Sequence, residues 1–185
     1  PAAGQRKFKS GSTRQTLKGI SLCAGFACGS AFVYKDILSR NILSYSINEE
    51  QTQKEWNRIQ KAIDYVTRDL QKLKTAVTSD IGKGKAEIFE VHKQILKDKT
   101  LINDLQAELK KELINAEQTV KNVFRRWSNK LLSSKNKSTR EKASDIDDLN
   151  RKILRVLLGY EKNVLESLPG KSIVVAIRLL PSDTV

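Results

Sequence analysis

Apolar residues recur at intervals of three and four from residue 46 onward. This spacing places them on one face of a helix and predicts amphipathic α-helices. The longest stripe comprises Trp56, Ile59, Ile63, Val66, Leu70, Leu73 and Val77. Gly82 and Gly84 are expected to end or kink this helix. Before it, Ser46-Ile47-Asn48-Glu49 has the form of a capping box, in which Ser46 and Glu49 would satisfy free backbone N–H groups reciprocally.

Four further apolar stripes of helical period follow. The second helix is expected to carry Ile88, Phe89, His92, Ile95 and Leu96 on one face. The third begins after Asp98 and carries Leu101, Leu105, Leu109 and Leu113. The fourth and fifth carry Val120, Val123, Phe124, Trp127 and Leu131, then Ile146, Leu149, Ile153, Leu154 and Leu157, with Gly159 closing the last. The polar segment 133–141 is expected to be a loop. Only packing of neighbouring stripes can hide them, so residues 46–159 are predicted to form a helical bundle.

The two ends of the chain have a different pattern. Residues 1–17 are basic, contain Gly and Ser, lack periodicity and indicate a flexible tail. Residues 18–45 open with short apolar runs among glycines, which favours two short buried strands with turns. In the last segment, 160–185, the run SIVVAI (172–177) indicates another buried strand. The predicted fold class is therefore mainly α, with a helical bundle inserted between strands of an incomplete α/β domain.

Charge leaves two interpretations of the surface open. The chain carries a formal net charge of +13, spread along it rather than gathered in one stripe. A Lys-rich solvated surface is favoured over a nucleic-acid-binding helical module. The alternative would use Arg125, Arg126, Lys130, Lys135 and Lys137, but aromatic residues are not interleaved with them for base stacking.

Cysteines and apolar runs bear on the compartment. Cys23 and Cys28 are too few for a disulfide framework or a metal site and are expected to be ordinary buried thiols. No apolar run reaches the length of a membrane span, and no hydrophobic signal segment follows the start. A cytoplasmic protein without a membrane partner is therefore expected.

Few residues could carry chemistry. His92 is the single histidine, and its place among apolar neighbours predicts a partly buried side chain rather than a nucleophile. Asp145, Asp147 and Asp148 form the one acidic cluster, which suits the first turn of a helix and an ion pair from Asp147 to Arg151 better than a metal site. No catalytic constellation and no metal site are predicted.

Four blocks of sequence carry a resemblance that periodicity alone does not supply. They are GISLCAGFACGSAF (19–32), AEIFEVHKQILKD (86–98), EKASDIDDLNRKILRVLLG (141–159) and IVVAIRLLPSDT (173–184). In this order and spacing, the chain resembles the N-terminal region of Enzyme I, the phosphoenolpyruvate–protein phosphotransferase of the bacterial sugar phosphotransferase system, over nearly all of residues 18–185.

The resemblance implies a helical subdomain inserted into an α/β phosphohistidine domain. Enzyme I moves phosphoryl from phosphoenolpyruvate to its own histidine and then to a histidine of the carrier HPr. That accepting histidine would lie beyond Val185, so no catalytic residue is expected here and the chain alone is expected to be inactive. The full-length enzyme is expected to need Mg²⁺ and to form a homodimer through a C-terminal part, whereas this chain is expected to be a monomer.

What the resemblance implies for this chain is the HPr-docking surface. The residues it implicates are Glu87, Glu90, His92, Gln94, Ile95, Asp98, Leu101, Leu131 and Lys142. Two departures matter: Lys142 stands where Arg is usual, and Lys97 and Lys99 stand where the family is rich in acid. The carrier is therefore hypothesised to have a more acidic docking face than usual. A regulator without transfer activity, a nitrogen-branch Enzyme I and a fused multi-domain phosphotransferase remain alternatives.

Overall fold

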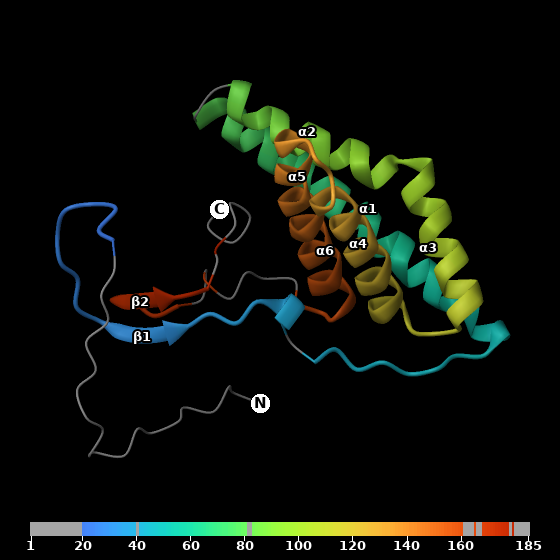
Figure 1. The fold of residues 1–185 in the computed structure, drawn as a ribbon. Helices are drawn as coiled ribbons and strands as arrows, with labels where there is room; N and C mark the ends of the chain where they lie inside the picture. Colours follow the sequence, from blue (N-terminus) through green and yellow to red (C-terminus); the bar gives the residue numbers. More distant parts are fainter. Residues whose placement is uncertain are drawn as a thin grey trace, which may run out of the picture.

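The structure, a computed structural model, describes residues 20–39, 41–80, 83–160, 165, 168–177 and 179. The predicted tail (1–17) and the Pro-Ser-Asp-Thr end of the last sequence block (181–184) lie outside these residues. Helices pack together on one side of the molecule, and a two-stranded sheet lies beside them (Figure 1). In chain order the described elements are β1 (Ser30–Val33), the 3₁₀ turn η1 (Ile37–Ser39), α1 (Glu49–Asp80), α2 (Lys83–Lys97), α3 (Lys99–Glu112), α4 (Ala116–Leu132), α5 (Lys137–Glu141), α6 (Ala143–Leu157) and β2 (Ser172–Val175).

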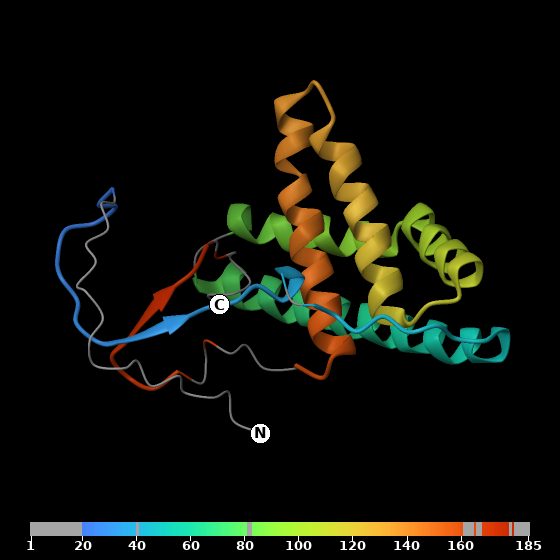
Figure 2. The same ribbon diagram turned by 60° about the horizontal axis from the view of Figure 1, so that its bottom comes forward.

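The mainly helical fold is confirmed, and the apolar stripes form its core. Helix α1 packs against α2 and α6, and α4 packs against α6. Figure 2 shows α4 and α6 side by side, joined through α5 at the far end from α1. The fully buried side chains include Ile59, Leu70, Leu96, Leu101, Leu105, Leu109, Val120, Phe124, Leu149, Ile153 and Leu154. Gly159 has a φ of +75°, which suits its predicted place after the last helix.

The capping box of α1 lies two residues later than predicted. The backbone N–H of Asn48 donates to Gln51 Oε1 at 3.0 Å, and the Gln51 N–H donates to Asn48 Oδ1 at 2.9 Å. Ser46 instead forms an antiparallel bridge with Ile114. Because that bridge holds residue 46 in an extended conformation, the helix cannot begin there.

A buried polar network starts α4. Glu55 of α1 accepts from the Ala116 N–H at 2.8 Å and from Arg58 Nη1 at 2.7 Å. Arg58 also pairs with Glu117. Asn115 precedes the helix without capping it; its side chain donates to Leu43 O and to Glu117. A carboxylate from another helix therefore supplies the cap, which no local sequence pattern indicates.

The two predicted strand regions share one sheet. β1 and β2 run parallel in the register Ser30 to Ser172 through Val33 to Val175. The helices lie between these strands in the chain, so the chain leaves and re-enters the sheet at neighbouring positions. Gly29 lies close to the residue that precedes β2: a Cβ built there would lie 1.9 Å from the Lys171 carbonyl oxygen.

The first strand region differs from its prediction. Residues 20–29 form no strand, and Ile20, Leu22 and Phe26 are almost fully exposed. Cys23 and Cys28 are exposed as well, so the expected buried thiols are wrong. The physical reason is that two strands present too little surface for these side chains to be buried against.

Two arginines of α6 hold the segment after β1 against the bundle. Arg151 Nε donates to both carboxylate oxygens of Asp36 at 2.8 Å, and Arg155 donates to the Tyr34 hydroxyl. The predicted ion pair from Asp147 to Arg151 is therefore replaced by one to Asp36. Burial opposes the charge of Arg151, but the hydrogen bonds and charge of Asp36 raise its pKa, and Asp147 and Asp148 add a longer-range attraction.

Candidate functional site

Helix α2 has one buried face and one open face. Phe89, His92 and Leu96 point into the bundle and are buried. Ile88 and Val91 are 39% and 43% exposed, and Ile95 is half-buried. Since residues three and four apart share a helix face, these three aliphatic side chains form an open stripe. We call this stripe and its exposed neighbours the α2 surface, which comprises Glu87, Ile88, Val91, Gln94, Ile95, Lys97, Asp98 and Lys99.

Periodicity missed part of this stripe. It assigned Ile88 to the buried face, and it did not mark Val91 at all. Helical spacing alone cannot separate a core stripe from an exposed one when both consist of aliphatic side chains. The available signal was the presence of apolar residues at 88, 91 and 95 in addition to Phe89 and Leu96, because one narrow helix face cannot bury both sets.

The acidic groups beside the stripe are largely engaged. Glu90 lies 2.7 Å from Lys74 Nζ and 3.2 Å from Lys93 Nζ. The hydrogen bond from Lys74, then that from Lys93, holds the pKa of Glu90 below its usual range. Asp98 caps α3, accepting from the Thr100 N–H at 2.7 Å, and this backbone bond lowers its pKa. Glu87 is exposed and keeps its carboxylate available.

A second candidate region is the end of the α4–α6 hairpin, residues 130–142, which we call the hairpin tip. Leu131 is half-buried, whereas Leu132 and Lys142 are exposed. The segment predicted to be a loop contains the short helix α5, with Asn136 capping it through the Ser138 N–H at 2.9 Å. Arg140 donates to the Ser134 and Lys135 carbonyl oxygens at 2.9 Å and thereby holds the tip in shape.

His92 and Asp145 bring the hairpin beside α2. His92 Nε2 lies 3.6 Å from Asp145 Oδ1 of α6. The histidine is 3% exposed, and neither ring nitrogen has a hydrogen-bond partner among the described residues. The prediction of a buried histidine is thus confirmed. The acidic cluster does lie at the start of α6, as predicted.

Two of the implicated docking residues lie in the interior. Leu101 is fully buried and His92 is 3% exposed, so both lie beneath the surface. The docking role that the resemblance implies for these two residues stays a prediction. Glu87, Gln94, Asp98 and Lys142 are exposed, and Glu90, Ile95 and Leu131 are half-buried.

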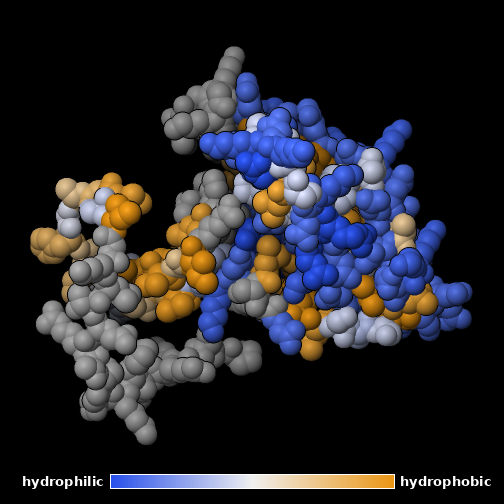
Figure 3. All heavy atoms as spheres, viewed as in Figure 1, coloured by the Kyte–Doolittle hydropathy of each residue, from blue (hydrophilic) through white to orange (hydrophobic). Residues whose placement is uncertain are grey.

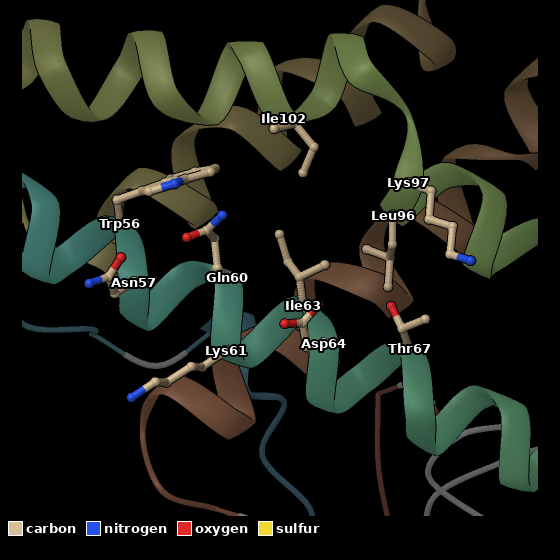
Figure 4. A pocket seen from close by; sticks show the side chains of 10 residues that line it. All are labelled: Trp56, Asn57, Gln60, Lys61, Ile63, Asp64, Thr67, Leu96, Lys97 and Ile102. Carbon is tan, nitrogen blue, oxygen red and sulfur yellow. The ribbon is translucent and has the colours of Figure 1, made fainter.

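A groove with a cavity volume of about 550 Å³ lies between α1 and the α2–α3 junction (Figure 4). Trp56, Ile63, Leu96 and Ile102 supply its apolar wall, while Lys61, Asp64 and Lys97 are among its polar lining. Asn57, Gln60 and Thr67 complete the lining. Lys97 belongs to both the groove and the α2 surface.

Other kinds of site find little support in the described part of the chain. There, no three His, Cys, Asp or Glu side chains gather as a metal ion would require. None of its helices combines the length and apolar character needed to cross a bilayer. In Figure 3 the bundle surface in view is mainly hydrophilic, and apolar residues gather on the sheet side.

Comparison with known proteins places these features in a family. The family model described as "PEP-utilising enzyme, N-terminal" matches residues 18–142. The chain belongs to this family. As a PEP-utilising enzyme N-terminal region, it is 29% identical over 170 residues to the phosphoenolpyruvate-protein phosphotransferase of Bacillus subtilis (strain 168), and 30% identical over 170 residues to that of Latilactobacillus sakei. These matches cover 92% and 91% of this chain, and the chain spans 29% of the length of each relative.

Solved structures support the same assignment. An Enzyme I protein solved by NMR has a TM-score of 0.71 to this PEP-utilising enzyme N-terminal region, with 31% identity over 91% of this chain and 68% of that one. A nitrogen Enzyme 1 N-terminal domain has a TM-score of 0.68 at 21% identity, covering 85% and 66% of the two chains, and shows the fold alone. The resemblance to Enzyme I inferred from the sequence is confirmed.

Proposed function

We propose that this chain is the HPr-docking part of an Enzyme I, a phosphoenolpyruvate–protein phosphotransferase. The observation that carries the proposal is the open aliphatic stripe Ile88–Val91–Ile95 on a helix of a family member. Burying such a stripe against a partner favours association. The charged residues around it orient the partner and raise the association rate. The parallel β1–β2 pair supports the corollary that the bundle is inserted into an α/β phosphohistidine domain.

In this proposal the described residues position a partner and perform no bond making. Phosphoryl would pass from phosphoenolpyruvate to a histidine of the longer enzyme and then to HPr, breaking one P–O bond and then one P–N bond. Mg²⁺ and phosphoenolpyruvate would bind parts of the full-length homodimer outside this chain. Transfer would take place in the cytoplasm, a setting that the exposed free thiols of Cys23 and Cys28 suit.

Isotope-labelled chain titrated with unphosphorylated HPr tests the proposal. We expect amide shifts confined to the α2 surface and the hairpin tip, with the groove-lining residues of α1 unchanged apart from those beside Lys97. Shifts caused instead by duplex DNA, at any sequence, would favour the nucleic-acid alternative. No shift with HPr at any concentration would contradict the docking function.

A further inference from the structure

Two lysines lie near the end of α2 that follows Ile95. Lys97 lies on the flank of α2 that faces α1, because it also lines the groove there. Lys99 opens α3 at the end of the stripe. Both are exposed, and neither forms an ion pair with a described residue.

The hairpin tip adds more charge of the same sign. Between residues 130 and 142 the basic residues are Lys130, Lys135, Lys137, Arg140 and Lys142, and the single acidic residue is Glu141. Glu141 lies 3.9 Å from Lys137, with both side chains mostly exposed, so it offsets little of the total. The contact of His92 with Asp145 brings this hairpin to the side of α2.

Acidic groups balance only part of this charge. Two lysines already share Glu90, and Asp98 is held at the positively polarised N-terminus of α3. Glu87 and Asp98 are both exposed, and their negative charges offset those of Lys97 and Lys99 within the α2 surface. When the hairpin tip and the cluster of Glu90, Lys74 and Lys93 are counted with the α2 surface, basic side chains outnumber acidic ones around the stripe.

From this arrangement we infer that the partner of the α2 surface is a protein whose contact face has an apolar centre and an acidic rim. This inference rests on the proposed function and specifies the chemistry of the carrier. The aliphatic stripe fits an apolar patch of a protein better than nucleic acid, because it offers no exposed aromatic ring on which bases could stack. The lysines would attract acidic groups and speed their encounter.

Two HPr probes test the inference. They are identical except around the phosphoryl-accepting histidine, where one carries a rim of Lys and the other a rim of Glu. Stopped-flow association with the full chain is measured at about 20 mM and about 500 mM salt, since exposed charges are screened at the higher value. We expect the Glu-rimmed probe to associate about tenfold faster at low salt, with the difference largely lost at high salt.

Charge-reversal variants of the chain, measured with the same two probes, complete the test. Lys97→Glu/Lys99→Glu should abolish the preference for the Glu-rimmed probe, whereas Lys54→Glu/Lys110→Glu changes the same charge at exposed positions elsewhere on α1 and α3 and should keep it. Thermal melts check that both variants fold. Amide shifts locate the contact in each case.

The outcomes separate the two proposals. If the Lys-rimmed probe associates as fast or faster while the same α2 amides shift, docking stands and the acidic-rim inference falls. If neither probe shifts the α2 amides, the proposed function falls and this inference with it. If duplex DNA shifts those amides and competes with both probes, the surface serves nucleic acid and the inference of a protein partner is overturned.

Discussion

Arg151 of α6 holds Asp36 with a bidentate contact, its Nε lying 2.8 Å from both carboxylate oxygens. These residues are 115 positions apart. The pair therefore joins the segment after β1 to the last helix of the bundle. Burial opposes ionisation of Asp36, but the hydrogen bonds and charge of Arg151 outweigh it and hold the pKa of Asp36 below its ordinary value near 3.8.

Removal of this carboxylate should destabilise the protein. In Asp36→Ala, Arg151 stays buried and loses its partner, at a cost of about 2 kcal/mol in the free energy of unfolding. Denaturant titration of the variant and the parent chain measures this loss of unfolding free energy. Glu141→Ala, which removes only the exposed pair with Lys137, is the control and should change stability by less than about 0.5 kcal/mol. Equal losses in the two variants would contradict the role of the Asp36 pair.

The same pair predicts a pH dependence. A carboxyl group whose pKa is lowered by folding stabilises the protein above the unfolded pKa, and this stabilisation is lost as pH falls through the folded pKa. This contribution to the free energy of unfolding should persist between pH 6 and the ordinary Asp pKa near 3.8. It should be lost as pH falls further, through the pKa of Asp36 in the folded protein. Asp36→Ala should therefore melt closer to the parent chain at about pH 2.5 than at pH 6. An unchanged gap in melting temperature would count against the mechanism.

The close approach of Gly29 to Lys171 predicts a large effect from one methyl group. Gly29→Ala would place Cβ 1.9 Å from the Lys171 carbonyl oxygen, so β1 and β2 must move apart. We expect amide protection of β1 and β2 to be lost while the bundle helices keep theirs. Gly170→Ala is the neighbouring control, because nothing lies within 4 Å of a Cβ there. If the amides of β1 and β2 stayed protected in Gly29→Ala, the distance between Gly29 and the Lys171 carbonyl would have to be larger than described.

Much of the bundle could be predicted from the sequence because burial follows a helical period. Ile59, Ile63, Val66 and Leu70 alternate at threes and fours, and all four are buried. Asp98 marks the start of α3 through a local cap. The features that could not be predicted depend on partners distant in the chain. Ser46 forms a β-bridge with Ile114. Arg151 pairs with Asp36 and not with Asp147, which is only four residues away.

The candidate site was harder to predict for a related reason. Likeness to a family marks positions but not their exposure, so Leu101 and Gln94 were equivalent in sequence. The structure separates them because Leu101 of α3 is fully buried, whereas Gln94 faces outward.

The contact of Glu55 with α4 gives a further prediction. Glu55→Ala leaves the buried Ala116 N–H without its acceptor and should cost about 2 kcal/mol of unfolding free energy. Glu55→Gln keeps an oxygen at that position and should lose clearly less. Urea titration of both variants measures the difference. Loss of the same size in both would assign the effect to charge rather than to capping.

A single change should separate docking from folding. Val91→Asp puts a charge in the centre of the exposed stripe, where apolar contact is expected, and should weaken HPr binding at least tenfold. The melting temperature should change little, since Val91 is 43% exposed and lies outside the core. Leu132→Asp makes the parallel test at the hairpin tip. Calorimetric titration gives the affinity, and undiminished binding by Val91→Asp would rule out the stripe as the contact.

The parallel pairing of Ser30 with Ser172 has a consequence for the order of folding. These strands meet only after the chain has passed through all the helices, and closing so long a loop in an unstructured chain costs on the order of 4 kcal/mol in entropy. Helices whose contacts are nearer in sequence avoid this cost. The bundle should therefore assemble first, bring the strand ends together as it does so, and leave β1–β2 pairing as a late event.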